Sequence, residues 1–259
     1  PLFGQLSVIS ILSPLGRTFL AFLVTIGRLS LFTGEAIAQG LRPPFYPRIL
    51  LRQMIEIGYY SLPVVGLTAV FTGMVLALQS YTGFSDFGAE KAIPQVVVWS
   101  ITRELGPVLA GLMVAGRIGA AMAAELGTKR VTEQIDALAT LATNPFKYLI
   151  APRLLAGLLM LPLLVLVADA IGIFGGYLVA SLKLGLNPTT YILNSIDALE
   201  WDGVVSGLVK AAVFGFLISL MGCYQGFNSR GGAQGVGTAT TNAVVSSAIL
   251  ILSFDYFIT

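Results

Sequence analysis

The chain has 259 residues, of which 56% are hydrophobic and 11% are charged, whereas about a quarter of the residues in an ordinary soluble domain are charged. Its mean hydropathy of +0.85 exceeds what a soluble core of this size can bury, which predicts one polytopic all-α membrane domain over residues 1–259. The net charge of +2, with dispersed basic residues, argues against nucleic-acid binding. With one cysteine and no histidine, the chain lacks the residues for an internal disulfide, a cysteine-pair metal or redox site, or a histidine-dependent triad.

The N-terminal part, residues 1–52, is predicted to lie at the cytoplasmic surface of the membrane. The apolar run between Arg17 and Arg28 has about ten residues, or ~15 Å of helix, which is too short for a ~30 Å hydrocarbon core. It therefore favours an interfacial helix, and the absence of a signal-peptide cleavage pattern after it leads us to expect a mature N-terminus. Residues 40–52 are broken by prolines, which predicts a juxtamembrane loop. Its arginines are Arg42, Arg48 and Arg52.

Five apolar stretches in residues 62–258 are long enough to cross the membrane. They cover approximately residues 62–81, 93–124, 149–182, 204–224 and 238–257. The second stretch contains Gly106 and Pro107, which predict a kink or a tilt in its upper third. The distribution of lysine and arginine among the connecting segments predicts a cytoplasmic N-terminus and a C-terminus on the opposite side.

Six charged residues fall within these stretches, where a charge is costly and usually faces a cavity, a partner or a substrate path. They are Arg103, Glu104, Arg117, Asp169, Lys210 and Asp255. At ~1.5 Å per residue, Arg103, Glu104, Lys210 and Asp255 fall in the outer half of the bilayer, on three helices. We expect these four to pair around one cavity, with structural salt bridges and snorkelling side chains as the alternative. Arg117 is expected to snorkel or pair near the cytoplasm, and Asp169 to hydrogen-bond between helices.

Small residues recur every fourth position along the second stretch. They are Gly111, Ala115, Gly119 and Ala123. A helix face nearly without side chains lets another backbone approach closely, either within the chain or from a second copy. Packing within the chain is the favoured interpretation.

Residues 125–145 are predicted to form a short amphipathic helix on the cytoplasmic side. At helical spacing, one face carries the apolar residues Val131, Ile135, Leu138 and Leu141. The polar positions include Lys129, Arg130, Glu133 and Asp136. Such a helix is either a connector lying on the lipid headgroups or a helix that docks into a groove on a partner. Periodicity alone does not separate the two.

A glycine-rich segment covers residues 226–237 and is predicted to be a flexible cytoplasmic turn. Glycine-rich loops can hold phosphate through backbone N–H groups, but no GK[ST] sequence follows these glycines. We therefore expect no nucleotide site in this chain.

The stretch from Arg103 to Leu138, RELGPVLAGLMVAGRIGAAMAAELGTKRVTEQIDAL, resembles the MlaE (YrbE-type) permease family, the membrane subunit of bacterial lipid-transporting ABC systems. The resemblance covers nearly the whole chain and includes the segment GFNSRGGAQGVGTATT. It implies an inner-membrane homodimer that binds two copies of a cytoplasmic ABC ATPase, a STAS-domain subunit and a hexameric periplasmic MCE-domain protein.

The resemblance also implies roles for particular residues. The ELGT..VTEQIDAL segment would be the coupling helix that inserts into the ATPase, which favours docking over the connector. The residues concerned are Glu125, Lys129, Arg130, Glu133 and Asp136. The four outer-half charges would belong to a lipid pocket, namely Arg103, Glu104, Lys210 and Asp255.

Together these observations predict an ABC transporter permease that moves phospholipid between the inner membrane and a periplasmic carrier and so maintains outer-membrane lipid asymmetry. The chain itself is expected to be no enzyme and to hold no metal or cofactor, with ATP and magnesium bound by the partner ATPase. A lipid-modifying membrane enzyme and a passive membrane scaffold are the alternatives. The absence of histidine disfavours the enzyme, and a scaffold would tolerate neutral residues in place of the intramembrane charges.

Overall fold

A computed structural model describes residues 2–259, and all regular structure within that range is helical. The chain divides into two units, Pro1–Phe45 and Tyr46–Thr259. The first unit contains one continuous helix, α1, over Leu2–Gly40. The predicted helix of about ten residues was too short, because neither Arg17 nor Arg28 ends the helix. Residues 15–42 contain no proline that would break it.

Part of α1 is long and apolar enough to be a sixth candidate membrane span. That part is Phe19–Gly40, with 22 residues. This assignment rests on length and composition and does not place α1 in the membrane. The interfacial position of α1 therefore stays a prediction.

About half of the segment predicted as a loop over residues 40–52 is helical. Helix α2 covers Pro47–Ile57, and only residues 41–46 separate it from α1. A proline fits the first position of a helix because the N–H that it lacks has no intrahelical partner there. Arg48 and Arg52 therefore lie on a helix and not in a loop.

The second unit is a bundle of long helices. After α2, its helices are α3 Leu62–Phe84, α4 Ile93–Ser100, α5 Gly106–Val114, α6 Ala120–Val131, α7 Gln134–Thr140, α8 Ala151–Leu182, α9 Pro188–Asp197, α10 Trp201–Phe227 and α11 Gly232–Ile258. They form five runs that are long and apolar enough to cross a membrane, over Pro47–Phe84, Glu90–Val131, Phe146–Leu182, Trp201–Phe227 and Gly232–Ile258. Each predicted span lies inside one of these runs. The prediction of an all-α membrane protein is confirmed.

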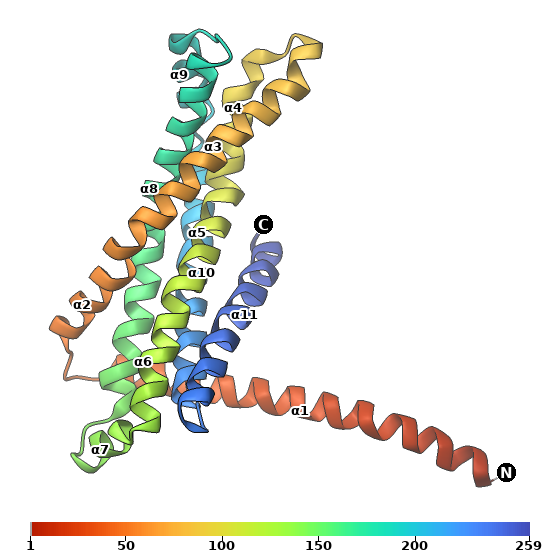
Figure 1. Cartoon of the computed structure of the whole chain (residues 1–259), viewed down its shortest axis with the longest axis vertical. Coiled ribbons are helices and arrows are strands. Elements are labelled where there is room, and N and C mark those ends of the chain that lie inside the picture. Colours follow the sequence, from red (N-terminus) through yellow and green to blue (C-terminus); the bar gives the residue numbers. More distant parts are fainter. Residues whose placement is uncertain (1) are drawn as a thin grey trace. The chain divides into compact units, whose positions relative to one another are not determined.

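Helix α8 packs against α2, α3 and α10, and α10 in turn packs against α6 and α11. Within this unit, α7 and the α10–α11 turn lie at one end of the bundle, while α9 and the α3–α4 connection lie at the other (Figure 1). Helix α9 begins where the Asn187 side chain accepts hydrogen bonds from the backbone N–H groups of Thr189 and Thr190, at 3.0 and 3.2 Å. The buried ring of Tyr191 holds this short helix to the bundle. Burial raises the pKa of the Tyr191 hydroxyl to about 12.

The second span is not a regular α-helix. A π-helical turn over Ile101–Leu105 separates α4 from α5, and a second one over Ala115–Gly119 separates α5 from α6. Pro107 follows the first turn and has no N–H to donate to the carbonyl of residue 103, four positions earlier. The span thus departs from regular α-helix geometry here, whereas the kink or tilt itself stays a prediction. The missing N–H of Pro107 leaves the Arg103 carbonyl available to another partner.

The line of small residues in the second span packs within the chain. Ala115 and Ala123 are buried. A Cβ added at Gly111 would lie 3.5 Å from the side chains of Phe214 and Ile251, which are in α10 and α11. The preferred interpretation of this pattern, packing within one chain, is confirmed.

Candidate functional site

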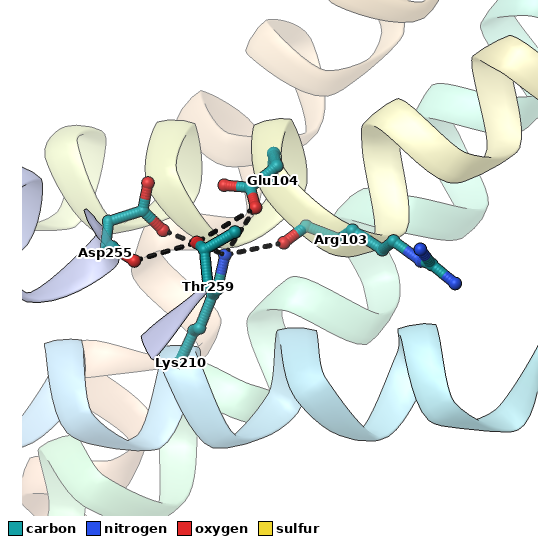
Figure 2. A network of polar contacts seen from close by, with 5 residues as sticks. All are labelled: Arg103, Glu104, Lys210, Asp255 and Thr259. Carbon is teal, nitrogen blue, oxygen red and sulfur yellow. Dashed lines mark hydrogen bonds and ion pairs between the residues drawn. The ribbon is translucent and has the colours of Figure 1, made fainter. Parts of the chain in front are cut away.

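The ammonium group of Lys210 is the centre of a polar network inside the helical bundle (Figure 2). Only 1% of the Lys210 side chain is exposed, and its Nζ lies 2.6 Å from Oε1 of Glu104 and 3.1 Å from Oδ1 of Asp255. The same ammonium donates to Oγ1 of Thr259 at 2.7 Å and to the backbone carbonyl of Arg103 at 3.2 Å. Pairing and hydrogen bonding of this kind are what allow a charge to remain inside a membrane.

The local backbone explains how these groups meet. The π-helical turn supplies Glu104 and the carbonyl that Pro107 leaves without an intrahelical donor, while α10 supplies Lys210. Asp255 lies in the last turn of α11, and Thr259 follows that helix. The Thr259 hydroxyl is within hydrogen-bonding distance of the Asp255 carbonyl, at 2.8 Å, and of Glu104 Oε1, at 3.2 Å. Sequence reasoning missed Thr259 because it is uncharged.

The side chain of Arg103 points away from this network (Figure 2). Its Nη2 lies 2.6 Å from Oε2 of Glu200, and its guanidinium carbon lies 5.9 Å from the centre of the Trp99 ring. Adjacent residues on a helix point in different directions, so Arg103 and Glu104 face different neighbours. The predicted pairing is found for Glu104, Lys210 and Asp255 and not for the Arg103 side chain. That these charges surround a cavity stays a prediction.

The two cations differ in what they can offer to an anion. Lys210 is covered by its own carboxylate partners, so a phosphate does not reach it in this arrangement. Arg103 is 46% exposed and has one carboxylate partner, Glu200, which is itself 51% exposed. An exposed guanidinium can bind a phosphate through two parallel hydrogen bonds. Arg103 is therefore the cation of this set that is placed for anion binding.

The two intramembrane charges without an assigned role lie elsewhere. Arg117 donates to the carbonyl of Glu56 at 3.1 Å and to Oγ of Ser61 at 2.8 Å, so it ties the second span to the junction between α2 and α3. Asp169 is buried on α8, and its Oδ1 has no hydrogen-bond partner within residues 2–259. The expected hydrogen bond between helices is therefore not found for this atom. Oδ1 of Asp169 lies against Gly106, and a Cβ added at Gly106 would be 1.9 Å from this oxygen.

The prediction of one amphipathic helix over residues 125–145 is wrong. Helix α6 continues to Val131, the chain turns at Glu133, and α7 then adds seven residues. Glu133 has a φ of 58°, a left-handed conformation that ends an α-helix. The apolar residues consequently do not share one face, since Ile135 is 2% exposed and Leu141 is 74% exposed.

Most charged residues of this region pair within the chain. Oε1 of Glu125 lies 2.6 Å from Nζ of Lys129, and its Oε2 lies 2.7 Å from Nη2 of Arg153, a residue that is 3% exposed. Arg130 and Asp136 form a further pair at 2.6 Å. Of the five predicted coupling residues, Glu133 is the one for which no such pair is described, and it is exposed.

The glycine-rich segment is also mostly helical, which corrects the prediction of a flexible turn over residues 226–237. Helix α10 ends at Phe227 and α11 begins at Gly232, so only residues 228–231 lie outside helices. Gly231 has a φ of 91°, which favours glycine. At Gly235 an added Cβ would lie 1.8 Å from the carbonyl oxygen of Arg230, so the turn closes directly on the first turn of α11.

Comparison with known proteins places this arrangement in a family. The family described as Permease MlaE matches residues 50–259. A probable ABC transporter permease protein of Rickettsia felis is 55% identical over 252 residues, covering 97% of each chain. The intermembrane phospholipid transport system permease protein MlaE of Haemophilus influenzae is 33% identical over 254 residues, again covering 97% of each chain. The chloroplastic protein TRIGALACTOSYLDIACYLGLYCEROL 1 of Arabidopsis thaliana is 37% identical over 227 residues, covering 87% of this chain and 65% of the plant protein. Since the family match takes in the whole second span, Lys210 and both of its acidic partners, the chain belongs to the MlaE permease family.

Proposed function

We propose that this chain is the permease subunit of an ABC transporter that moves phospholipid between the inner membrane and a periplasmic MCE-domain carrier, and that it thereby maintains outer-membrane lipid asymmetry. The names of the Rickettsia and Haemophilus relatives support the ABC transporter and the phospholipid parts of this proposal. The chain itself carries out no chemical reaction and holds no cofactor. ATP and magnesium are bound by the partner ATPase.

The observation that carries the proposal is the π-helical turn Ile101–Leu105. On one side it offers the exposed guanidinium of Arg103, and on the other it anchors Glu104 to the buried ammonium of Lys210. One short element thus links a group that can bind phosphate to a network that joins three spans. This arrangement suits the wall of a lipid path better than a catalytic centre. The carboxylates of Glu104 and Asp255 are paired with Lys210 and are therefore not free to act as a general base.

Each polar group has a distinct role in the proposed mechanism. Two copies of the chain enclose an outward-facing cavity whose apolar walls contact the acyl chains. Arg103 exchanges its contact with Glu200 for the lipid phosphate, while Glu104 and Asp255 hold Lys210 and so keep the wall in place. Direct phosphate binding by Lys210 requires a second conformation in which these carboxylates move away.

The proposed assembly is an inner-membrane homodimer with its N-terminus in the cytoplasm and its C-terminus in the periplasm. Two ABC ATPases and a STAS-domain subunit bind on the cytoplasmic side, and a hexameric MCE-domain protein binds on the periplasmic side. The turn between α6 and α7 contacts the ATPase. Two ion pairs near this turn transmit the ATPase movement: Arg130 with Asp136 joins α6 to α7, and Glu125 with Arg153 joins α6 to α8.

Replacing Arg103 with glutamine is expected to lower lipid transport about tenfold, because a charge-assisted contact with phosphate is worth about 1.5 kcal/mol or more. The measurement is transfer of fluorescent phospholipid in proteoliposomes that contain the complete transporter. Lys183→Gln is the matched control, since Lys183 is exposed outside the helices. Glu200→Gln frees the guanidinium and is expected to retain transport. Normal transport by Arg103→Gln would remove Arg103 from the lipid path.

Replacing Glu133 with lysine is expected to reduce co-purification of the ATPase at least several-fold, because the substitution reverses the charge of an exposed residue at the proposed contact. Asp86→Lys makes the same charge change in the exposed connection at the other end of the bundle and serves as the control. Equal recovery of the ATPase with both variants would exclude Glu133 from the contact.

A further inference from the structure

One face of α2 carries both positive and apolar side chains, and it is exposed. Arg48, Leu51, Arg52 and Ile55 follow one another at helical spacing, with Leu51 58% and Ile55 54% exposed. Together with Glu56 and Tyr60 they line an open hollow of about 460 Å³. The sequence predicted a juxtamembrane loop for residues 40–52 but no binding role for these side chains.

The two guanidinium groups on this face are not engaged by other side chains. Among the described side chains, neither Arg48 nor Arg52 has a hydrogen-bond or ion-pair partner. Arg130 and Arg153, by contrast, are each paired with a carboxylate. Arg48 and Arg52 lie four residues apart, so their charges add on one helical face. The face therefore offers an anion two cations that form no described ion pair, although the Glu56 carboxylate lines the same hollow.

The opposite face and both ends of α2 are fixed to the rest of the unit. Gln53 and Ile57 are buried, and α2 packs against α8. At the start of the helix the ring of Tyr46 meets that of Tyr148, with their centres 5.3 Å apart. At its end, Arg117 donates to the Glu56 carbonyl. The arginine face is consequently presented outward on a rigid support, which lowers the entropic cost of binding a ligand.

The depth of α2 in the membrane follows from helix lengths. Helix α3 has 23 residues, or ~35 Å at ~1.5 Å per residue, and by itself crosses a hydrocarbon core of ~30 Å. Helix α2 belongs to the same candidate span, Pro47–Phe84, but since α3 is long enough without it we place α2 at the level of the headgroups. The rings of Tyr59 and Tyr60 between the two helices are 66% and 56% exposed, as is typical of residues at the membrane–water interface.

We propose that this face of α2 binds the headgroup of an anionic phospholipid from the adjacent leaflet. The phosphate lies between Arg48 and Arg52, and the upper part of an acyl chain lies along Leu51 and Ile55. Cations and apolar side chains on a single face at headgroup depth match an amphipathic lipid, whereas a free anion would use only the cations. This site is separate from the Lys210 network, and binding to it requires neither transport nor the ATPase.

The test is to reconstitute the full chain in nanodiscs of phosphatidylcholine that contain a minor fraction of phosphatidylglycerol. Release into detergent and native mass spectrometry then give the ratio of the two lipids retained by the protein. We expect the unaltered protein to retain phosphatidylglycerol preferentially, and the double variant R48Q/R52Q to lose about tenfold or more of that preference. The double variant K91Q/K183Q, which removes the same charge from two exposed lysines, is expected to keep the preference. Glu56→Gln is expected to keep or increase it, because an acidic neighbour of the phosphate is removed.

Three outcomes would overturn the proposal. The first is an unchanged lipid ratio in R48Q/R52Q, and the second is equal loss in K91Q/K183Q. The third is displacement of the lipid by inorganic phosphate as effectively as by dispersed short-chain phosphatidylglycerol, which would indicate a free-anion site. Because α2 is exposed on this face, the glutamine variants are expected to fold, and their thermal unfolding is measured alongside. Failure here would leave the transport proposal untouched, since that proposal is judged by lipid transfer and ATPase binding.

Discussion

Replacing Lys210 with methionine is expected to lower the free energy of unfolding of the detergent-purified protein by about 3 kcal/mol. The substitution keeps much of the side-chain volume but removes the cation that Glu104 and Asp255 share. Two carboxyl groups and the Arg103 carbonyl are then left facing one another without a cation, and the Thr259 hydroxyl is the one described donor beside them. The loss is measured by chemical or thermal unfolding, followed by circular dichroism.

The control for this prediction neutralises the whole network. In the triple variant K210M/E104Q/D255N no charge remains, so most of the lost stability is expected to return, because a fully replaced ion network costs far less than a broken one. Arg103→Gln is expected to change stability by less than about 1 kcal/mol, since both partners of its ion pair are about half exposed. A K210M variant no less stable than the triple variant would show that the ion pairs contribute little to the bundle.

The depth of these charges could be predicted from the sequence, but their directions could not. A rise of ~1.5 Å per residue is enough to place Glu104, Lys210 and Asp255 in the same half of the bilayer. Whether Arg103 or Glu104 faces the network depends on the local winding, and the π-helical turn there changes the direction of every following side chain. The carbonyl contact with Lys210 has a signal in the sequence, namely the proline four residues after Arg103.

Helix ends were harder to predict than helix positions. The apolar pattern located all five spans after residue 52, because a membrane requires long apolar runs. The region after Glu125 has no such requirement, and hydrophobic periodicity there continued across a break that depends on one left-handed residue, Glu133. Glutamate is not a residue type that predicts such a conformation. In the same way, the glycines after residue 231 indicated a loop, but they lie in the first turns of α11.

The closest helix contacts were not those that the pattern of small residues indicated. The line from Gly111 to Ala123 is visible because its members repeat within one helix. Gly73 on α3 and Gly172 on α8 are separated by about a hundred positions, yet their backbones nearly touch. Gly157 on α8 and Gly215 on α10 form a second contact of this kind. A pair of single glycines on different helices gives no periodic signal, and only the folded arrangement identifies it.

Replacing Gly73 with alanine is therefore expected to lower the free energy of unfolding by about 3 kcal/mol and to reduce lipid transport, because overpacking forces neighbouring groups apart. The added Cβ would lie 1.8 Å from the carbonyl oxygen of Gly172, a backbone atom that cannot rotate away. Helices α3 and α8 would have to separate, and α8 also supports α2 and α10. Unfolding in detergent and lipid transfer in proteoliposomes measure the two effects.

The matched control for Gly73 lies on the same helix. At Gly83 an added Cβ meets nothing within 4 Å, so alanine there is expected to leave stability unchanged or to raise it slightly through its better helix propensity. If Gly73→Ala and Gly83→Ala unfold alike, the α3–α8 contact does not depend on the absence of a side chain. If only Gly73→Ala is destabilised, the close approach of the two backbones holds α3 against α8. Helices in lipid have no hydrophobic driving force to associate, so such close packing must supply the attraction.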